Sequence, residues 1–450
     1  MNVLVLGGGG REHAIAWKIS QSKDCSQLFV MPGNPGTGRI GKNLAGSPKD
    51  FSKVRQAVLD NNVDLVVVGP EDPLVGGLGD FFAEDPALKD VLFIGPCSKG
   101  AALEGSKEFA KQFMQRHSIP TAAFRSFTSS SIDEADRFLE SLKAPYVLKA
   151  DGLAAGKGVL ICQDLDQAKA ELRNMLGGKF GSAGNTVVIE EFLSGIEVSM
   201  FILTDGKDYL LLPEAKDYKR IGDGDTGLNT GGMGAVSPVP FVTDEFKDKV
   251  IKRIVVPTLD GLREEGIPYK GFIFLGLMNC GGDPYVIEYN VRMGDPETEA
   301  VMTRIDSDLL HHLTMCAKGR LGEEKIKISE RGALTVVCVS GGYPEGYKKG
   351  IRIDGNAFTS DNPDVNIFHM GTSLSDDGIL ATSGGRVLAI TANSRQTDCS
   401  NNSETPSQKA VRLIGEGRDA CYPEAEKIRF EGRYFRKDIG LDIIRFIEKG

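Results

Sequence analysis

The run Val286–Thr298 carries three kinds of polar side chain at alternating positions. Glu288, Asn290 and Arg292 alternate with apolar or aromatic residues, so on a strand they would share one face. Such groups are costly to bury unless they bind something. A carboxylate and an amide oxygen are ligands that Mg²⁺ prefers, and a guanidinium suits a phosphate or a carboxylate. The pattern favours a phosphate–metal site, and the alternative is a solvated sheet face.

A glycine-rich turn, GGGGREH at 7–13, follows the apolar run 2–6 directly. Adjacent glycines let backbone N–H groups approach an anion at a helix N-terminus. The strict dinucleotide fingerprint fails, because Glu12 or His13 occupies its last glycine position. The next strand also ends in Met31-Pro32 rather than in the acid that would hold a ribose. The turn favours a bound phosphate over a dinucleotide oxidoreductase, and a turn without ligand is the alternative.

A second glycine-rich loop, DGLAAGKG at 151–158, follows Lys149 and leads into the apolar run 159–162. We expect a strand–loop–strand hairpin, which can close over a triphosphate while lysines neutralise it. The loop is not a Walker A motif, because no Ser or Thr follows the lysine and a strand comes next. A flexible surface hairpin is the alternative.

Two further segments contain candidate binding groups. Glu190-Glu191-Phe192-Leu193 ends an expected strand, and these residues with Glu197 can hold an adenine amine and ribose hydroxyls or form a solvated acidic end. The segment 217–238 reads as a loop with mixed charges and many glycines. Ordinary connections are about 4–6 residues long, so this length favours a loop that faces a substrate.

Composition excludes several classes of protein. The 450 residues carry a net charge of −9, which argues against a nucleic-acid binder. No two of the 8 cysteines are close enough for a CxxC pair, and the 5 histidines have no metal-ligand spacing. No apolar run approaches the ~18 residues of a membrane span, and no leader pattern precedes residue 10. We expect a cytoplasmic chain without a membrane partner.

The order of expected elements predicts an α/β protein of several domains. Strands alternate with helices over the first hundred residues, which is typical of a doubly wound parallel sheet. Antiparallel hairpins follow, and from about residue 328 the sequence predicts mostly strands. The polar stretch 393–407 is expected to be an exposed loop. No GxSxG, HExxH or Ser/His/Asp arrangement is evident.

The whole set of motifs resembles the phosphoribosylamine–glycine ligase family of ATP-grasp enzymes in purine biosynthesis. The resemblance covers nearly the whole chain and runs through VLVLGGGGREHA, PGNPGT, VVVGPEDPLVGGL, LKADGLAAGKGV, GDGDTGLNTGGMGA, EYNVRMGDPET, VSGGYPEGYKKG, TSGGRVL and YFRKDIG. It implies an N-terminal doubly wound domain (1–103), a central two-lobed ATP-grasp domain (104–326, small lobe about 122–193) and a C-terminal β-rich domain (327–450).

The resemblance also implies an activity. ATP and glycine would give glycyl phosphate, which 5-phosphoribosylamine converts to glycinamide ribonucleotide, with release of ADP and phosphate. Mg²⁺ or Mn²⁺ would assist, no protein nucleophile would be needed, and the chain would be a monomer with small-molecule partners only. Another ATP-grasp carboxylate–amine ligase or carboxylase is the alternative, although it leaves GGGGREHA and PGNPGT unexplained. Glu288, Asn290 and Arg292 argue against a noncatalytic nucleotide sensor.

Site residues follow from the same resemblance. The positions that match the ATP site are Lys107, Lys149, Gly152, Gly156, Lys157, Glu190, Glu191, Phe192, Leu193, Glu197, Lys219 and Asn229. The metal ligands would be Glu288 and Asn290. The positions near the other substrates are Gly9, Arg11, Glu12, Asn34, Gly36, Thr37, Glu71, Pro73, Arg292, Gly294 and Asp295. The groups at the reacting ends would be Lys149, Asp217, Arg292 and Asp295.

The sequence departs from the general pattern in three places. GLMN at 276–279 lacks the extra metal carboxylate of many ATP-grasp enzymes. Tyr218 stands where the pattern leads us to expect histidine, although a tyrosine can still donate a hydrogen bond. The stretch 393–407 is longer and more polar than expected, and we assign it no catalytic role.

Overall fold

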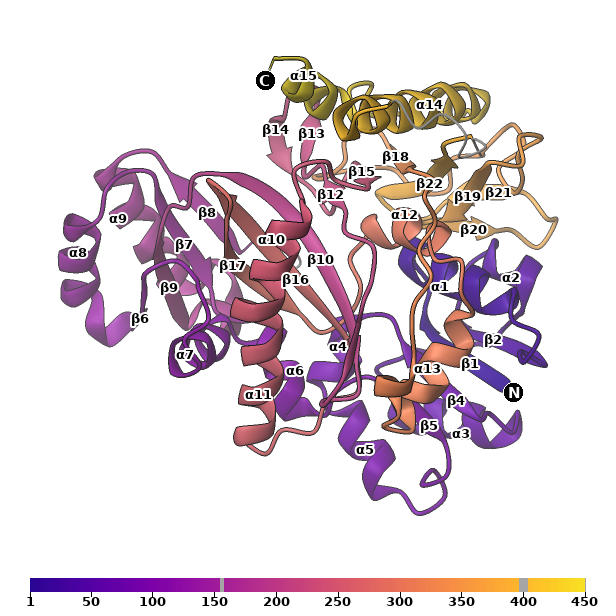
Figure 1. Ribbon diagram of the computed structural model, residues 1–450, viewed down its shortest axis with the longest axis horizontal. Coiled ribbons are helices and arrows are strands. Elements are labelled where there is room, and N and C mark those ends of the chain that lie inside the picture. The colour runs from indigo at the N-terminus through magenta and orange to yellow at the C-terminus, as the bar shows by residue number, and fades with distance from the viewer. Residues whose placement is uncertain (154–157, 396–403, 450) are drawn as a thin grey trace.

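The computed structural model describes residues 1–153, 158–395 and 404–449. Its colours run along the chain in Figure 1, where the N-terminal region, the central region and the C-terminal region pack side by side. None of the described helices is long and apolar enough to cross a membrane.

The N-terminal region is a parallel sheet covered on both faces, as predicted. Its strands lie in the order β3-β2-β1-β4-β5. Val3 and Val5 of β1 pack in the same core as α1, whereas Leu4 and Leu6 pack with α3. Alternate residues of one strand thus serve opposite faces. The bounds are β1 Asn2–Gly7, α1 Gly10–Ser20, β2 Gln27–Pro32, β3 Lys42–Asn43, α3 Phe51–Asp60, β4 Leu65–Val68 and β5 Leu92–Ile94.

A small lobe of the central region lies at the left of Figure 1. Its antiparallel sheet has the order β6-β9-β7-β8, and β7 and β8 form the predicted hairpin. Leu148, Ile189 and Leu172 belong to its separate core. The bounds are β6 Phe124–Thr128, α8 Ile132–Ser141, β7 Tyr146–Ala150, β8 Val159–Cys162, α9 Leu165–Asn174 and β9 Thr186–Glu191.

A second antiparallel sheet, in the order β11-β10-β16-β17, forms the middle of the molecule. A β-bulge falls at Ile287, because Leu277 pairs with Val286 and Gly276 with Glu288. The bounds are α6 Ser98–Gly105, α7 Lys107–Arg116, β10 Ile196–Thr204, β11 Tyr209–Leu211, α10 Asp244–Val250, α11 Val256–Glu264, β16 Gly271–Cys280 and β17 Asp283–Asn290. Since β17 ends at Asn290, Arg292 lies beyond the strand, and the expected common face holds for Glu288 and Asn290 only.

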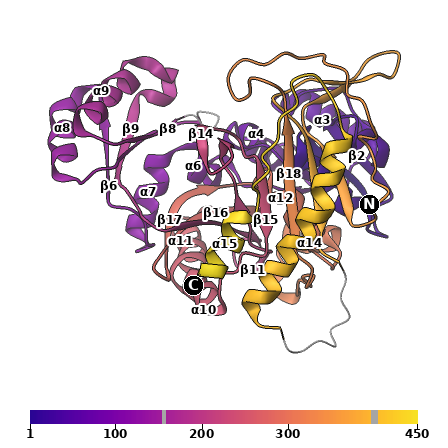
Figure 2. The same cartoon turned by 90° about the horizontal axis from the view of Figure 1, so that it is seen from above.

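The third large sheet combines central and C-terminal strands in the order β12-β15-β18-β22-β19. Helix α14 crosses it, as Figure 2 shows from above. The bounds are β12 Lys216–Asp217, β15 Gly234–Ser237, β18 Ala333–Val339, β19 Val365–His369, β22 Arg386–Asn393, α14 Pro406–Lys427 and α15 Leu441–Lys449. The sheet therefore spans the expected limit between residues 326 and 327.

The expectation of a loop over 217–238 is wrong, because the segment contains strands. β12 and β15 have only two and four residues, and β15 pairs with β18 about a hundred residues further on. Between them lies the hairpin of β13 Arg220–Gly222 and β14 Thr226–Asn229. The turn of this hairpin places Gly224 and Asp225 at φ of 69° and 54°. Both tolerate the left-handed region better than most residues.

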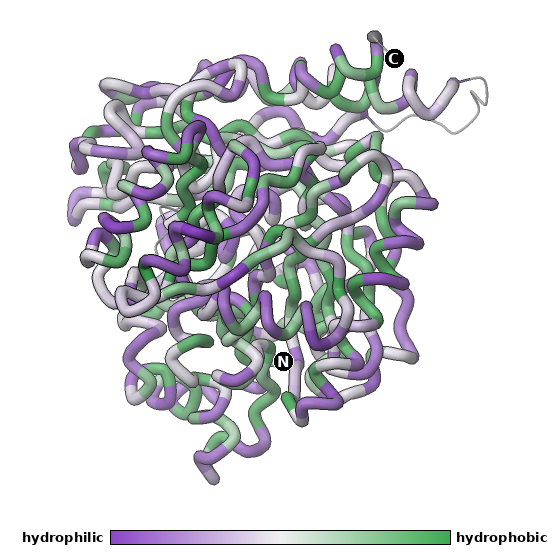
Figure 3. The backbone as a smooth tube through the Cα atoms, turned by 90° about the vertical axis from the view of Figure 1, so that its left-hand side faces the viewer, coloured by the Kyte–Doolittle hydropathy of each residue, from purple (hydrophilic) through white to green (hydrophobic). Residues whose placement is uncertain are grey.

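The remaining α-helices connect these sheets, and two further strands, β20 and β21, pair with each other in a small separate sheet. They are α2 Thr37–Ile40, α4 Glu71–Val75, α5 Leu78–Glu84, α12 Glu297–Thr303, α13 Leu309–Ala317, β20 Thr372–Leu374 and β21 Leu380–Thr382. Hydrophilic and hydrophobic residues alternate along the outer helices in Figure 3. This alternation is expected for helices with one face on a sheet.

Candidate active site

Two buried lysines share the carboxylate of Glu190. The Nζ atoms of Lys149 on β7 and of Lys111 on α7 each lie 2.9 Å from one oxygen of Glu190 on β9. Burial raises the pKa of Glu190, but the two ammonium groups outweigh it and hold that pKa below its usual range. Lys149 also donates to the carbonyl of Ile287 over 3.1 Å, at the bulge of β17.

Lys107 adds a third ammonium group to this cluster. It lies one helical turn before Lys111, and its Nζ donates to the carbonyl of Gly152 over 3.2 Å. Burial, with a further contribution from the charge of Lys149, lowers the pKa of Lys107 and lowers that of Lys111 to about 8. Two of the three ammonium groups pair with Glu190, and the third, that of Lys107, lies close enough to Lys149 to feel its charge. This lysine cluster (Lys107, Lys111 and Lys149) fits a polyphosphate, which would supply the missing negative charge.

An acidic pocket adjoins the lysine cluster. It is lined by Glu197, Val198, Ser199, Asp217, Lys219, Phe274, Gly276, Leu277, Ile287 and Glu288. Lys219 Nζ lies 2.6 Å from Glu197. Burial lowers the pKa of Lys219, but Asp217, Glu197 and Glu288 raise it well above its usual value. Burial raises the pKa of Asp217. With one ammonium among three carboxylates, the pocket can accept a further cation.

Glu288 and Asn290 fit a hard cation. They share one face of β17, and the buried amide nitrogen of Asn290 has no hydrogen-bond partner among the described residues. Gly276 pairs with Glu288, and a Cβ there would lie 3.2 Å from Glu288 Cγ, so the glycine leaves room beside the carboxylate. The described residues contain no cluster of three or more His, Cys, Asp or Glu that could hold a metal. Phosphate or water oxygens would have to complete the coordination.

A pair of guanidinium groups meets at Glu71. Glu71 Oε2 lies 3.2 Å from Arg292 Nε and 4.0 Å from Arg11 Nη2. Burial raises the pKa of Glu71, but the two arginines outweigh it and lower that pKa on balance. Arg11 also lies 2.7 Å from Glu12, whose other oxygen accepts from the backbone N–H of Gly9 over 2.7 Å. The α1 N-terminus, α4 and the chain beyond β17 thus meet here.

Glu104 is a site residue that the sequence reasoning missed. Its Oε1 lies 2.7 Å from Arg292 Nη2, and its Oε2 accepts from the backbone N–H of Val291 over 2.8 Å. Burial raises the pKa of Glu104 to about 7, against the opposing effect of Arg292. No motif in the sequence marks this glutamate. Lys111 carried a weak signal, because it stands four residues after Lys107 on one helical face.

Arg386 of the C-terminal region also contacts this part of the site, through Asp295. It pairs with Asp295 over 2.9 Å and donates to the carbonyls of Asp295 and Gly231 over 2.9 and 2.6 Å. Asp295 in turn faces Gly9, where a Cβ would lie 3.6 Å from its Oδ2. Arg386 belongs to the TSGGRVL motif, so the sequence offered a reason to count it among the candidate site residues.

Asn34 and Thr37 organise the loop before α2. The amide of Asn34 donates to the carbonyls of Gly8 and His369 over 3.0 and 2.9 Å and accepts from the N–H groups of Gly36 and Thr37. Asn34 thereby ties the glycine-rich turn to β19. Both the NH₂ group and the oxygen of the Asn34 amide are therefore hydrogen-bonded within the protein.

Gly36 has no room for a side chain. A Cβ would collide with the His13 ring and lie 2.7 Å from Cδ2 of His369. Gly36→Ala is therefore expected to destabilise the protein by about 1–3 kcal/mol through overpacking, as measured by urea unfolding. The control is Gly415→Ala in α14, where a Cβ meets nothing within 4 Å. This exchange should instead stabilise by about 0.5–1 kcal/mol, and equal effects of the two exchanges would contradict the packing argument.

Glu299 is a buried carboxyl whose two oxygens have no hydrogen-bond partner among the described residues. It lies against Gly10 of α1. Burial raises its pKa well above the usual value, and the charge of Asp295 adds to this effect. Glu299 therefore tends to be neutral in the folded chain.

Glu299→Gln is expected to stabilise the protein increasingly as the pH rises. A folded-state pKa above the unfolded value means that the wild type loses stability as the pH climbs from about 4.5 toward the folded pKa, whereas glutamine does not titrate. At pH 8 urea unfolding should favour the variant by about 1–3 kcal/mol, with little difference at pH 4.5. Glu345→Gln, at an exposed position, is the control. A pH-independent difference would refute a neutral Glu299.

Some expected residues lie outside these clusters. Asn229 is exposed on β14, and Glu191 and Phe192 are exposed at the end of β9. Glu191 accepts from the backbone N–H of Ala123 over 2.9 Å. Pro73 is buried in α4. Gly156 and Lys157 fall outside the described residues.

Family models match three consecutive parts of the chain. The N domain of phosphoribosylglycinamide synthetase matches residues 1–104, its ATP-grasp (A) domain residues 105–298 and its C domain residues 333–442. The phosphoribosylamine–glycine ligase of Pseudomonas aeruginosa is 44% identical over 448 residues, which are 99% of this chain and 98% of that protein. The ligase of Escherichia coli O6:H1 is 43% identical over 444 residues, 98% of each chain.

Solved structures give the same picture. The crystal structure of phosphoribosylamine–glycine ligase from Thermotoga maritima has a TM-score of 0.81 at 34% identity and covers 98% of this chain and 100% of that one. A biotin carboxylase domain of Hydrogenobacter thermophilus 2-oxoglutarate carboxylase, with MgADP and bicarbonate, has a TM-score of 0.70 at 16% identity, covering 99% and 93% of the two chains. The second likeness concerns the fold alone.

Fold and site together define an ATP-grasp protein, with a small lobe facing a central sheet and a lysine cluster between them. Within that class, the matched domains and the full-length relatives decide the membership. The chain belongs to the phosphoribosylglycinamide synthetase family. The α/β multidomain fold and the family resemblance expected from the sequence are thereby confirmed.

Proposed function

We propose that this protein is an ATP-dependent ligase that joins glycine to 5-phosphoribosylamine. Its products are glycinamide ribonucleotide, ADP and phosphate, in the second step of de novo purine biosynthesis. The observation that carries the proposal is the adjacency of two complementary clusters. The lysine cluster and the acidic pocket meet near Glu288: Ile287 and Glu288 line the pocket, and Lys149 donates to the carbonyl of Ile287 over 3.1 Å. The charge of Glu288 opposes the burial that lowers the pKa of Lys107 and helps to raise the pKa of Lys219.

The nucleotide would lie with its phosphates on the lysine cluster. Lys107 and Lys149 would neutralise phosphate charge, and Glu190 holds Lys149 in place through the 2.9 Å ion pair. The residues at the end of β9 and Glu197 would contact the adenosine. Gly152, Gly156 and Lys157 belong to the loop proposed to cover the phosphates. Exclusion of water by such a cover protects an acyl phosphate from hydrolysis.

Glu288 and Asn290 would hold Mg²⁺ or Mn²⁺, since they offer a carboxylate and an amide oxygen from one face of β17. When bound, such an ion neutralises phosphate charge and orients the phosphate chain. Asp217 and Lys219 line the same pocket. Lys219 would contact phosphate oxygens from its position beside Glu197.

The second half of the site would bind glycine and phosphoribosylamine. The glycine carboxylate attacks the γ-phosphate, and the phosphoribosylamine nitrogen then attacks the carbonyl carbon of glycyl phosphate. Arg292, oriented by Glu71 and Glu104, would hold the carboxylate. The α1 N-terminus with Gly9 and Arg11 would receive the ribose phosphate. Asp295 and Gly294 would face the reacting amine. Positioning and charge neutralisation suffice for this chemistry.

We place the domain limits at 1–103, 104–326 and 327–450. Two short strands of the middle domain, β12 and β15, belong to the sheet of the C-terminal domain. The protein would act as a cytoplasmic monomer on small molecules, without nucleic acid or membrane.

The direct experiment mixes the protein with ATP, Mg²⁺, glycine and freshly made phosphoribosylamine and measures ADP. Omission of each substrate in turn provides the controls, and ADP formation should require all of them. Bicarbonate in place of glycine tests the carboxylase alternative. No ADP above these controls would overturn the proposal.

A further inference from the structure

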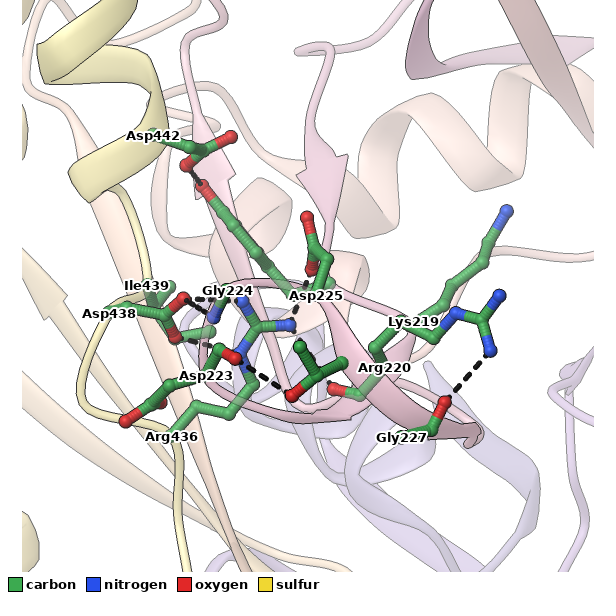
Figure 4. A network of polar contacts seen from close by, with 12 residues as sticks. Lys219, Arg220, Asp223, Gly224, Asp225, Gly227, Arg436, Asp438, Ile439 and Asp442 are labelled. Atoms are coloured by element: carbon green, nitrogen blue, oxygen red, sulfur yellow. Dashed lines mark hydrogen bonds and ion pairs between the residues drawn. The ribbon is translucent and has the colours of Figure 1, made fainter.

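The motif YFRKDIG near the C-terminus has no part in the chemistry above, yet its residues contact the hairpin of β13 and β14. Figure 4 shows these contacts, with Arg436 and Asp438 on one side and the hairpin on the other. We call residues 436–442 the C-terminal clasp. The hairpin follows directly on Lys219 of the acidic pocket.

Arg436 is the centre of the clasp. Its side chain is 1% exposed. Nη1 donates to Asp225 over 2.6 Å and to the carbonyl of Arg220 over 3.1 Å, while Nε and Nη2 donate to Asp438 over 2.8 and 2.7 Å. Because the guanidinium is planar and has partners on both sides, it fixes both the orientation of the hairpin relative to the clasp and the distance between them.

The hairpin turn has two further bonds to the clasp. The N–H of Gly224 donates to Asp438 Oδ2 over 2.7 Å, and the N–H of Lys437 donates to Asp223 Oδ1 over 2.9 Å. Backbone and side chains of the turn are both engaged. The clasp therefore fixes the turn as a unit rather than through one ion pair.

Tyr218 connects the other side of Lys219 to the same clasp. Its hydroxyl donates to Asp442 over 2.6 Å and accepts from the N–H of Gly440 over 3.0 Å. The guanidinium of Arg436 lies 5.2 Å from its ring centroid. The unexpected tyrosine thus points into the clasp and not into the pocket.

Lys219 therefore stands between two residues that the clasp holds, Tyr218 and Arg220. Its own side chain points to Glu197, 2.6 Å away in the acidic pocket. A lysine side chain has large rotamer freedom, so a fixed backbone is what keeps its ammonium group in one place. We propose that Arg436 is a positioning residue that fixes Lys219 in the nucleotide site. This inference rests on the proposed nucleotide site and adds the C-terminal clasp to it.

The test compares Arg436→Gln with Arg433→Gln. Arg433 immediately precedes this motif and is also well bonded, to the carbonyls of Ala425 and Ile428 and to Glu426, 2.7 Å away. None of these partners belongs to the hairpin. Both exchanges therefore remove a guanidinium with several hydrogen bonds near the C-terminus, Arg436 fully buried and Arg433 partly so, but only the exchange of Arg436 releases the hairpin.

The readout is the affinity for MgADP, measured by titration calorimetry. Arg436→Gln should weaken binding at least ~10-fold, whereas Arg433→Gln should remain within about 3-fold of the wild type. In a Lys219→Met background, Arg436→Gln should have little further effect, because a residue that acts through Lys219 has nothing left to position. Tyr218→Phe, which keeps the packing and removes the two hydroxyl bonds, should give a smaller loss of the same kind.

Equal losses for the two arginine variants, or an undiminished effect of Arg436→Gln without Lys219, would overturn the inference. If Arg436→Gln does not fold, Tyr218→Phe with and without Lys219→Met decides by the same criterion. MgADP binding needs neither glycine nor phosphoribosylamine. A wild type that binds MgADP but forms no product therefore refutes the proposed function and leaves this inference standing.

Discussion

Lys149→Met is expected to lower ADP formation by about 10²–10³-fold, the usual effect of removing one preorganised charge at a transition state. Lys149 is buried, and its ammonium group lies 2.9 Å from Glu190 at the proposed phosphate site. The exchange also leaves Glu190 with Lys111 as its one cationic partner among the described residues, which should cost about 2–3 kcal/mol of unfolding free energy. Activity and urea unfolding are measured on the same preparations.

A second exchange separates the two effects. In Lys149→Met/Glu190→Gln the uncompensated buried carboxylate is gone, so stability should return while activity stays low. Lys143→Met, at an exposed position of the same lobe, is the control and should change neither quantity. A double variant that regains turnover would show that Lys149 acts only through the stability of the lobe.

Glu288→Gln is the second exchange with a large expected effect. It keeps the shape of the side chain but removes the negative charge that would bind the metal, so turnover should fall by at least ~10². The Mg²⁺ concentration for half-maximal activity should rise as well. Titration of MgCl₂ against ADP formation at saturating ATP measures both. Folding should survive, because the side chain borders a pocket.

The control for this exchange is Glu134→Gln, which neutralises an exposed carboxylate on α8. It should leave turnover and the Mg²⁺ dependence unchanged. Near-normal turnover of Glu288→Gln, with an unshifted Mg²⁺ profile, would remove the metal assignment at Glu288 and Asn290.

Much of the fold was accessible to sequence reasoning because its signals are local. The parallel sheet of the first hundred residues follows from short apolar runs alternating with helices, and the β7–β8 hairpin from a glycine-rich loop between two such runs. The strands β12 and β15 were missed because two to four residues carry no periodicity and their partner β18 is distant. Helix α14 also went unnoticed, since the polar stretch before it hid its start at Pro406.

The residues of the candidate site likewise divide into those that local sequence patterns predicted and those that they did not. Residues within compact motifs, such as Lys149 and Glu288, were found because chemistry requires their types at short spacing. Glu104, Lys111 and Arg386 act through ion pairs between segments that lie far apart in the chain. Glu104 stands in no motif, whereas the spacing of Lys111 from Lys107 and the TSGGRVL motif around Arg386 are signals that do not name their distant partners. The face expected for Glu288, Asn290 and Arg292 was right only for the first two, because the strand ends at Asn290.

The shared sheet of central and C-terminal strands has a consequence for synthesis on the ribosome. β15 ends at Ser237, but β18, its neighbour in the sheet, begins at Ala333. Translation at about 5–20 residues per second leaves an interval of roughly 5–20 s before the partner strand exists. During that time the nascent chain exposes an unpaired strand edge, while β16 and β17 of the central sheet are still being made. We therefore expect the nascent chain to be most prone to non-native strand pairing in this interval of translation.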